Sequence, residues 1–141
     1  MHALPEWHRG TPAILCVAGP HAIPVSTAIR VSERRVVLAL GRRRATLARL
    51  REHPEVALCV LGAGVAFTAY GSARVVRDEL RAAAHVAAVA LDVARVQDHL
   101  EGSRTELLDG ARWRWTEAAA ADDERRILAE LEELGRGGGR G

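Results

Sequence analysis

The stretch VVLALGRRRATLARLREHPEVALCVL, residues 36–61, contains the signals of a strand, a helix and a second strand in succession. Its apolar start predicts a strand that ends at Gly41, because glycine after such a run marks a turn. Residues 42–53 have leucines on one face and arginines on the other, which predicts an amphipathic helix. A proline stops that helix, and residues 55–61 are apolar on both faces, which favours a central strand.

Further apolar runs extend this pattern on both sides of the helix. Before it, residues 13–18, 22–31 and 35–40 predict a meander of three antiparallel strands. After the strand at 55–61, a glycine-rich turn leads into a long strand over residues 65–76. Short polar links of this kind favour antiparallel pairing over a parallel sheet with crossover helices.

The next segment combines helix and strand signals. Residues 78–84 are predicted to form a short helix. Residues 88–96 are predicted to be a strand in which Leu91, Val93 and Arg95 share one face, because side chains two apart point the same way.

An Asp-Gly pair at 109–110 is a strong hairpin signal, because both residues tolerate the backbone angles of a tight turn. It predicts strands over residues 105–108 and 111–116. Trp113 and Trp115 would then lie on one face of the second strand.

The last predicted element is a helix that Asp122 or Asp123 caps and Gly135 ends. Its apolar face would carry Ile127, Leu128, Leu131 and Leu134. Three acidic residues are predicted to form a solvated face that balances neighbouring arginines: Glu130, Glu132 and Glu133.

The elements together predict a mainly β protein with two helices. We expect a six- to seven-stranded antiparallel barrel, closed or partly closed, with one helix after the third strand and one at the C-terminus. Residues 1–134 would form a single domain, of which residues 1–10 are an N-terminal arm. Residues 135–141 would be a disordered Gly/Arg tail.

Charge and hydropathy exclude two classes of partner. All 20 basic residues are arginines, yet the formal net charge is only +2, which argues against a nucleic-acid-binding face. The apolar runs are shorter than the roughly 20 residues of a membrane span, and no secretory signal opens the chain. We therefore expect a cytoplasmic protein that binds neither nucleic acid nor membrane.

Cysteines and histidines show no metal-binding pattern. Cys16 and Cys59 lie in apolar runs outside any CxxC pair, which favours buried free thiols. The six histidines are not at metal-ligand spacing, so no metal site is expected.

The turn after residue 40 is a candidate anion site. Gly41 is followed by three arginines at 42–44 and by the start of the predicted helix, with Thr46 in its first turn. A helix N-terminus offers unpaired N–H groups, and guanidinium groups match phosphate oxygens. The alternative interpretation is a solvated basic face on an arginine-rich protein.

A wider succession of segments resembles a known family. The segment IPVSTAIR at 23–30 precedes the strand at 36–40, and LARLREHPEVAL at 47–58 precedes AYGSARVV at 69–76. This order resembles the pyridoxamine 5'-phosphate oxidase-like family of split β-barrels, which bind flavin mononucleotide (FMN) or its deazaflavin relative F420. The resemblance covers roughly residues 12–96. It implies an FMN-binding split barrel that forms a homodimer with the cofactor at the interface.

The resemblance also implies which residues hold the cofactor. The residues facing the flavin ring would be Ser26, Thr27 and Ala28. The residues near the phosphate would be Leu40, Arg42, Arg43, Arg44 and Thr46. Many members have an Arg-Lys pair where this chain has Ala45-Thr46, so Arg43 and Arg44 would act from slightly earlier positions.

The function that the resemblance implies is a flavin- or deazaflavin-dependent oxidoreductase acting on a small organic substrate, with FMN or F420 as cofactor. The alternative is a non-catalytic protein that binds or stores a flavin, F420 or haem in the same barrel. No catalytic residue is assigned, because the cofactor itself carries such redox chemistry.

The tryptophans allow two interpretations each. Trp113 and Trp115 could form a pocket wall that stacks on a cofactor or substrate, or could pack at a dimer interface or barrel end. Trp7 could cover the pocket or anchor the N-terminal arm.

Overall fold

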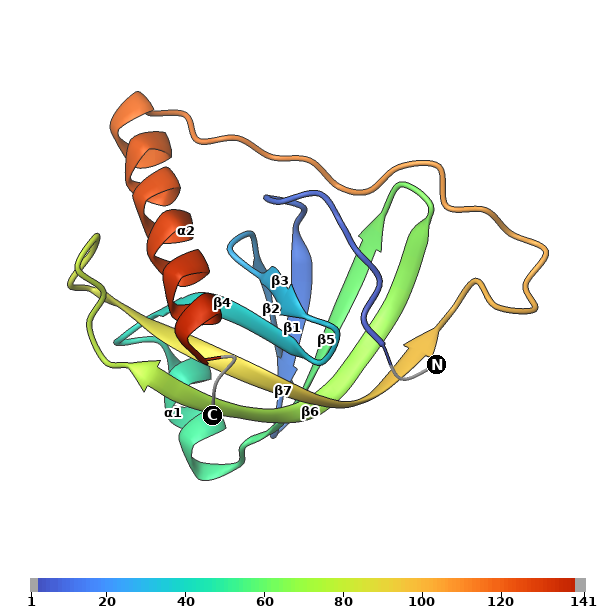
Figure 1. Ribbon diagram of the computed structural model, residues 1–141, viewed down its shortest axis with the longest axis horizontal. Helices are drawn as coiled ribbons and strands as arrows, with labels where there is room; N and C mark the ends of the chain where they lie inside the picture. Colours follow the sequence, from blue (N-terminus) through green and yellow to red (C-terminus); the bar gives the residue numbers. More distant parts are fainter. Residues whose placement is uncertain (1–2, 139–141) are drawn as a thin grey trace.

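Seven strands form one sheet in the computed structural model, which describes residues 3–138. They are β1 (Ala13–Val17), β2 (His21–Val25), β3 (Ile29–Ser32), β4 (Arg35–Gly41), β5 (Glu55–Gly62), β6 (Val65–Arg77) and β7 (Val86–Asp98). Their spatial order is β2-β1-β5-β6-β7-β4-β3, and each pairing is antiparallel (Figure 1). The sheet curls without closing, and β2 and β3 are its edges. The predicted antiparallel fold of six to seven strands is therefore confirmed in its open form.

The predicted second strand is two strands in the structure, so the first helix follows the fourth strand and not the third. The run over residues 22–31 is interrupted at residues 26–28, which link β2 to β3. Thr27 holds this link against β4, because its Oγ1 accepts the Ala39 N–H at 3.0 Å and donates to the Ala39 carbonyl at 3.3 Å. The link therefore runs beside β4 without extending the sheet.

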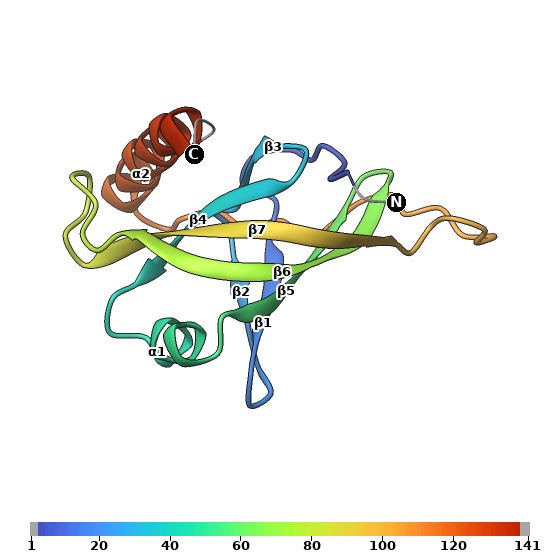
Figure 2. The same cartoon turned by 60° about the horizontal axis from the view of Figure 1, so that its bottom comes forward.

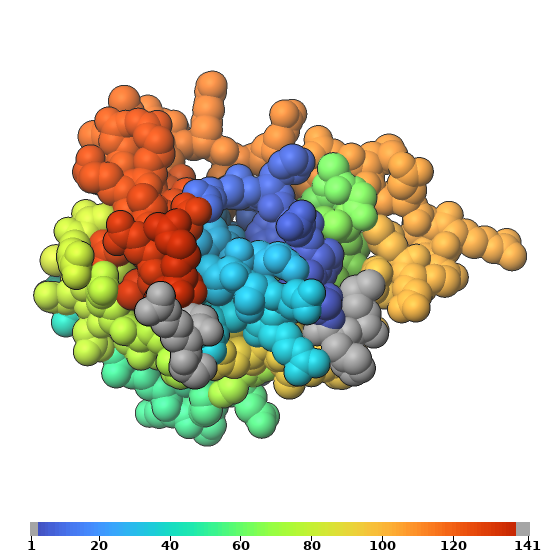
Figure 3. All heavy atoms as spheres, viewed as in Figure 1, coloured from blue at the N-terminus to red at the C-terminus, as the bar shows by residue number. Residues whose placement is uncertain are grey.

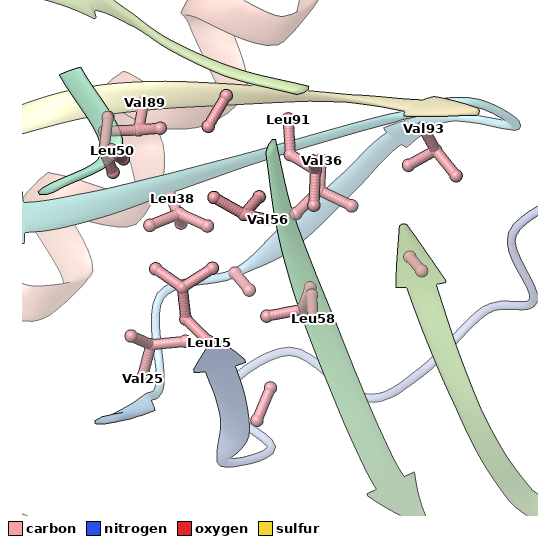
Figure 4. Packing of buried hydrophobic residues seen from close by; sticks show 14 of the residues in the cluster. Leu15, Val25, Val36, Leu38, Leu50, Val56, Leu58, Val89, Leu91 and Val93 are labelled. Atoms are coloured by element: carbon pink, nitrogen blue, oxygen red, sulfur yellow. The ribbon is translucent and has the colours of Figure 1, made fainter. Parts of the chain in front are cut away.

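The concave side of the sheet encloses the main core. Leucines and valines from β1, β4, β5 and β7 point toward one another there, as Figure 4 shows for Leu15, Leu38, Leu58 and Leu91. Aliphatic side chains fill this core because the chain has few aromatic residues. Burial of such side chains contributes most of the favourable free energy of folding.

The N-terminal arm packs against the barrel. The Trp7 ring lies 5.6 Å from the Phe67 ring, and its Nε1 donates to the Ala28 carbonyl at 3.2 Å. The Leu4 N–H donates to the Glu33 carbonyl at 2.8 Å, next to edge strand β3. Of the two interpretations of Trp7, the structure therefore supports the anchor.

A bulge in β7 changes the predicted face of one residue. Tyr70 pairs with Arg95 and Gly71 with Val93, which leaves Ala94 as an extra residue. Beyond the bulge, Val96 and not Arg95 points into the core. The Arg95 guanidinium instead lies over the Tyr70 ring, 4.1 Å from its centroid. The prediction that Arg95 shares a face with Leu91 and Val93 was wrong. The extra residue at the bulge reverses which side chains of β7 point inward beyond it.

Two helices lie on opposite sides of the sheet, as Figure 2 shows. Helix α1 (Ala45–Glu52) confirms the predicted first helix. Helix α2 (Ala118–Gly138) packs on β3 and β4 through Ile127 and Leu131. It begins four residues before Asp122, since its alanines are good helix formers.

The predicted end of α2 at Gly135 was also wrong. A Cβ atom at Gly135 would lie 2.2 Å from Cγ1 of Val31, so glycine is needed there for close approach of the helix to β3. The helix continues to Gly138. Residues 139–141 of the predicted disordered tail lie outside the described residues.

Residues 104–116, called the strap below, contain no strand, so the hairpin predicted at 109–110 was wrong. The strap runs past the β5–β6 turn, where Gly64 N–H donates to the Leu107 carbonyl at 2.8 Å. A Cβ atom at Gly110 would lie 2.2 Å from the Leu61 carbonyl oxygen. Both predicted strands are largely exposed, and an isolated hairpin with no face to bury is marginally stable. Figure 3 shows the orange strap standing out from the rest of the molecule.

Glu130 organises the β6–β7 loop, residues 78–85. Its carboxylate is buried and accepts the N–H groups of Arg81 at 2.9 Å and Ala82 at 2.8 Å. It also forms a 2.7 Å ion pair with Arg77. The loop adopts bends and turns, so the short helix predicted at 78–84 was wrong, as was the assignment of Glu130 to a solvated face.

These contacts set the protonation of Glu130. Burial alone would raise the pKa of Glu130, but the two backbone N–H groups and the Arg77 guanidinium outweigh burial and hold this pKa below its ordinary value. Because the folded-state pKa is lowered, the stabilising effect is present above the unfolded pKa of about 4.3. It is lost as the pH falls through the folded-state pKa.

We predict that Glu130→Gln lowers the free energy of unfolding by about 1.5–3 kcal/mol at neutral pH, since hydrogen bonds to a charged group are lost. The difference from wild type should shrink as the pH falls from the unfolded-state pKa of about 4.3 through the lowered folded-state pKa, below which the carboxylate is protonated in both states. Urea denaturation at several pH values measures it. Glu133→Gln is the control, because Glu133 is an exposed residue of the same helix. An equal loss in both variants at neutral pH would contradict the role of burial.

Candidate functional site

A cavity of about 770 Å³ opens between the strap, α2 and the open edge of the sheet. Its walls are residues 23–27 of β2 and the following link, residues 39–41 at the end of β4, residues 113–115 of the strap, and Arg9, Gly10, Arg44, His85, Val86, Ala120, Asp123, Glu124 and Ile127. We call it the Trp-lined cavity. Trp113 and Trp115 both line it, although they lie on a strap and not on the predicted strand.

Glu124 of α2 links three walls of the Trp-lined cavity. The Ser26 hydroxyl donates to its Oε1 at 2.6 Å, and the Trp115 Nε1 donates to its Oε2 at 2.7 Å. The carboxylate therefore ties the β2–β3 link and the strap to the helix. The Trp115 side chain remains about half exposed, so its ring forms the outer rim of the cavity.

A second cavity of about 930 Å³ lies beside the first, over the N-terminus of α1. It is lined by Gly41, Arg42, Arg43, Arg44, Leu47, Ala48, Arg51, Asp78, Glu79, Ala84 and His85. We call it the Arg-lined cavity. The two cavities share Gly41, Arg44 and His85, so together they form one elongated site with an apolar end and a basic end.

Two of the four arginines of the basic end are already paired. Arg42 pairs with Glu79 at 2.7 Å, and Arg51 pairs with Asp78 at 2.8 Å. These pairs are exposed, so each contributes little to stability. Among the described residues, neither Arg43 nor Arg44 has an ion pair, which leaves these two guanidinium groups available to an anion.

The backbone around Gly41 directs these groups. Arg44 is the N-cap of α1, in an extended conformation with no side-chain capping bond. Its side chain lies along Gly41, where a Cβ atom would come within 3.1 Å of Arg44 Cγ. Arg43, Arg44 and Leu47 of the first helical turn line the Arg-lined cavity, so the arginines lie at the N-terminal end of α1, where the helix dipole favours an anion.

The structure brings together most of the residues that the family resemblance implied. Ser26, Thr27, Leu40 and Arg44 line the Trp-lined cavity, while Arg42, Arg43 and Arg44 line the Arg-lined cavity.

Ala28 and Thr46 line neither cavity. Ala28 is buried beneath Trp7, and the buried Thr46 hydroxyl lies 2.8 Å from Nε2 of His21. Thr46 thereby ties α1 to β2, which is a structural role.

Several lining residues were not singled out by sequence reasoning. They are Glu124, His85, Arg51, Asp78 and Glu79. Glu124 had a usable signal, because it precedes Ile127 by three residues and so shares the inward face of α2. Asp78 and Glu79 had no such signal in the sequence, since their position depends on how Glu130 shapes the β6–β7 loop.

Solved structures share this arrangement of strands. A candidate pyridoxamine 5'-phosphate oxidase from Lactobacillus delbrueckii has a TM-score of 0.58 and 15% identity, with 69% of this chain and 95% of that chain covered. An F420 reductase has a TM-score of 0.56 and 10% identity, with 67% and 98% covered. The chain has the split-barrel fold of pyridoxamine 5'-phosphate oxidase-like proteins.

A haem-binding protein from Mycobacterium smegmatis shares the split barrel as well. Its TM-score is 0.52 at 18% identity, with 64% of this chain and 49% of that chain covered. No protein-family model and no curated protein matched the sequence. The likeness is thus one of fold. The three proteins are named for chemically different ligands: pyridoxamine 5'-phosphate, F420 and haem.

Two further features bear on the type of site. Within residues 3–138, no group of three or more His, Cys, Asp or Glu side chains is placed to hold a metal ion. No helix in that part of the chain has the length and apolar character needed to cross a membrane.

We predict that Thr46→Val lowers the free energy of unfolding by about 0.5–1.5 kcal/mol, because His21 loses its partner. The affinity for a phosphate-bearing ligand should not change, since Thr46 lines neither cavity and its hydroxyl contacts His21. Thermal or urea unfolding and ligand titration measure the two effects. Thr68→Val is the matched control, because Thr68 makes the equivalent 2.8 Å contact with His99 away from the site. A loss of affinity in Thr46→Val alone would instead make Thr46 a ligand contact.

Proposed function

We propose that this protein binds FMN or F420 in the elongated site and acts as an oxidoreductase on a small organic substrate. The observation that supports it best is the meeting of an apolar, tryptophan-lined cavity with an arginine-lined cavity at Gly41 and Arg44. A flavin or deazaflavin has the same polarity along its length, with a flat ring at one end and phosphate at the other.

At the basic end, Arg43 and Arg44 would hold the phosphate. Both side chains are exposed and available, and guanidinium groups donate paired hydrogen bonds to phosphate oxygens. The positive end of the α1 helix dipole would add a further favourable interaction with the phosphate. This set replaces the Arg-Lys pair that many proteins of the resembled family have at the positions of Ala45 and Thr46.

At the apolar end, Ile23, Val25 and Leu40 would face one side of the ring, with the tryptophans of the strap along the rim. Aromatic side chains favour such stacked or edge contacts. The bound cofactor would supply the redox chemistry, and the chain would bind it, orient it and exclude water. The same site without turnover would be a binding or storage protein for a flavin, F420 or haem.

We predict that changing Arg43 and Arg44 together to Ala weakens FMN or F420 binding by about 1.5–3 kcal/mol for each charged hydrogen bond lost. Titration with each cofactor, followed by absorbance or fluorescence, measures the affinity. A double change of the exposed Arg34 and Arg104 to Ala is the control, because it removes the same charge away from both cavities. Equal affinity in both double variants would mean that Arg43 and Arg44 form only a solvated face.

The spectrum of the purified protein separates the candidates. A flavin or deazaflavin spectrum with reduction by an added hydride donor would support the oxidoreductase, and a Soret band would support haem binding. A colourless protein that binds neither FMN nor F420 when they are added would contradict the proposal.

A homodimer is the second part of the proposal. Within residues 3–138, five of the six exposed large apolar side chains belong to the outer face of β1 and β5 or to the strap: Ile14, Leu61, Leu108, Trp113 and Trp115. The strap contacts β5 at Leu61, and Cys16 and Cys59 lie half-buried on the same sheet face, so we propose that these residues form one apolar surface. Such a surface is typical of a protein interface.

This surface includes the rim of the Trp-lined cavity, so a second subunit seated on it would border the cofactor site. We predict that wild type sediments as two subunits and that Leu61→Glu shifts the mass toward one subunit, because a carboxylate is costly to bury. Val76→Glu is the control, since Val76 is an exposed apolar residue of β6 outside this surface. A one-subunit mass for wild type would contradict the dimer.

A further inference from the structure

Glu124 has the geometry of a ligand-binding carboxylate. It reaches from α2 into the Trp-lined cavity, where Ile127, one turn farther along the helix, packs against β3 and β4. Ser26 and Trp115 each donate one hydrogen bond to it, at 2.6 and 2.7 Å. A carboxylate has about four acceptor positions, so about two remain for a further donor.

Glu124 lies in a cavity that Arg9, Arg44 and Arg114 also line, yet none of them forms an ion pair with it. Its acidic neighbours Asp122 and Asp123 pair with Arg125 and Arg126, one turn along the helix. Glu124 itself forms no ion pair with any residue between 3 and 138, and both of its donors are neutral. Glu124 is partly buried, and a partly buried carboxylate is stabilised by each donor that it gains.

The walls around Glu124 restrict the kind of donor. Residues 23–25 and the tryptophans at 113 and 115 line a space suited to a flat ring, whose polar groups lie on its edge. A ring lying between these walls presents its edge to the side walls of the cavity, and Glu124 is the carboxylate that holds two of those walls together.

We propose that Glu124 determines ligand specificity by accepting a hydrogen bond from an N–H group on the edge of a flat heterocycle bound in the Trp-lined cavity. The inference rests on the proposed function, for which this group is the imide N–H of the flavin or deazaflavin ring. Ser26 and Trp115 act as positioning residues, because their hydrogen bonds fix the direction in which the carboxylate points.

The substitution Glu124→Gln tests the charge with little change of shape. The amide removes the negative charge and replaces one acceptor oxygen with an N–H donor, which repels the N–H donor of the ring. Asp122→Asn is the matched control, since it makes the same change of charge two residues away, at an exposed side chain outside the cavity. Trp115→Phe keeps an aromatic ring at the rim and removes only the hydrogen bond to Glu124.

The experiment compares FMN with FMN methylated at the imide nitrogen, by titration of the full chain. Wild type and Asp122→Asn should bind FMN about tenfold more tightly than the methylated ligand, the value of one hydrogen bond to a charged group. Glu124→Gln should lose about tenfold for FMN and bind both ligands alike. Trp115→Phe should weaken the preference for FMN without abolishing it, because the carboxylate remains but keeps only the Ser26 hydrogen bond that positions it.

The outcomes separate this inference from the proposed function. Binding of FMN with no preference by wild type, or an unchanged preference in Glu124→Gln, overturns the role of Glu124 and leaves the cofactor site standing. An unchanged preference in Trp115→Phe would overturn the positioning role of Trp115. If only F420 is bound, Glu124→Gln should bind F420 more weakly than Asp122→Asn does. Equal affinities of the two variants for F420 would overturn the role of Glu124. If neither cofactor is bound, both proposals fall. Should Glu124→Gln not fold, the two ligands compared on wild type and Trp115→Phe still decide.

Discussion

The shortness of the link between β2 and β3 constrains the whole molecule. Val25 ends one edge strand and Ile29 begins the other, so only residues 26–28 connect the two edges of the sheet. Four Cα steps reach at most about 14 Å, whereas seven strands laid flat would hold their edges about 29 Å apart. The sheet must therefore curl until its edges approach each other, which encloses the core seen in Figure 4 and leaves a gap between β2 and β3.

That gap explains why the candidate site lies where it does. In a closed barrel, the polar groups near residues 26–28 would pair within the sheet. Here they find other partners: Ser26 binds Glu124, Thr27 binds the backbone of Ala39, and the Ala28 carbonyl accepts from Trp7. The helix, the strap and the N-terminal arm converge on the open edge because its polar groups need them. The Trp-lined cavity is the space that these segments leave between them.

Sequence reasoning succeeded where a local pattern determines the structure. Strand β5 and helix α1 were predicted from the spacing of apolar residues and from the breaks at Gly41 and Pro54. The three arginines at 42–44 precede the helix as expected. It failed where a distant contact overrides the local signal. Gly135 serves close packing on Val31 and does not end the helix, and Glu130 is buried because loop N–H groups bind it. The neighbouring sequence does not distinguish a glycine that ends a helix from one that allows close packing, or an exposed glutamate from a buried one.

Helix α2 sets both ends of the candidate site through two carboxylates on neighbouring turns. Glu124 holds Ser26 and Trp115 at the apolar end, while Glu130 shapes the β6–β7 loop at the basic end. That loop places Asp78 and Glu79 against two of the four arginines of the Arg-lined cavity. Since these exposed pairs add little stability, their main consequence is to select which guanidinium groups remain available. The number of arginines near the turn therefore does not equal the number of guanidinium groups that can bind an anion. Helix α2 and the β6–β7 loop that it holds determine which arginines are already paired.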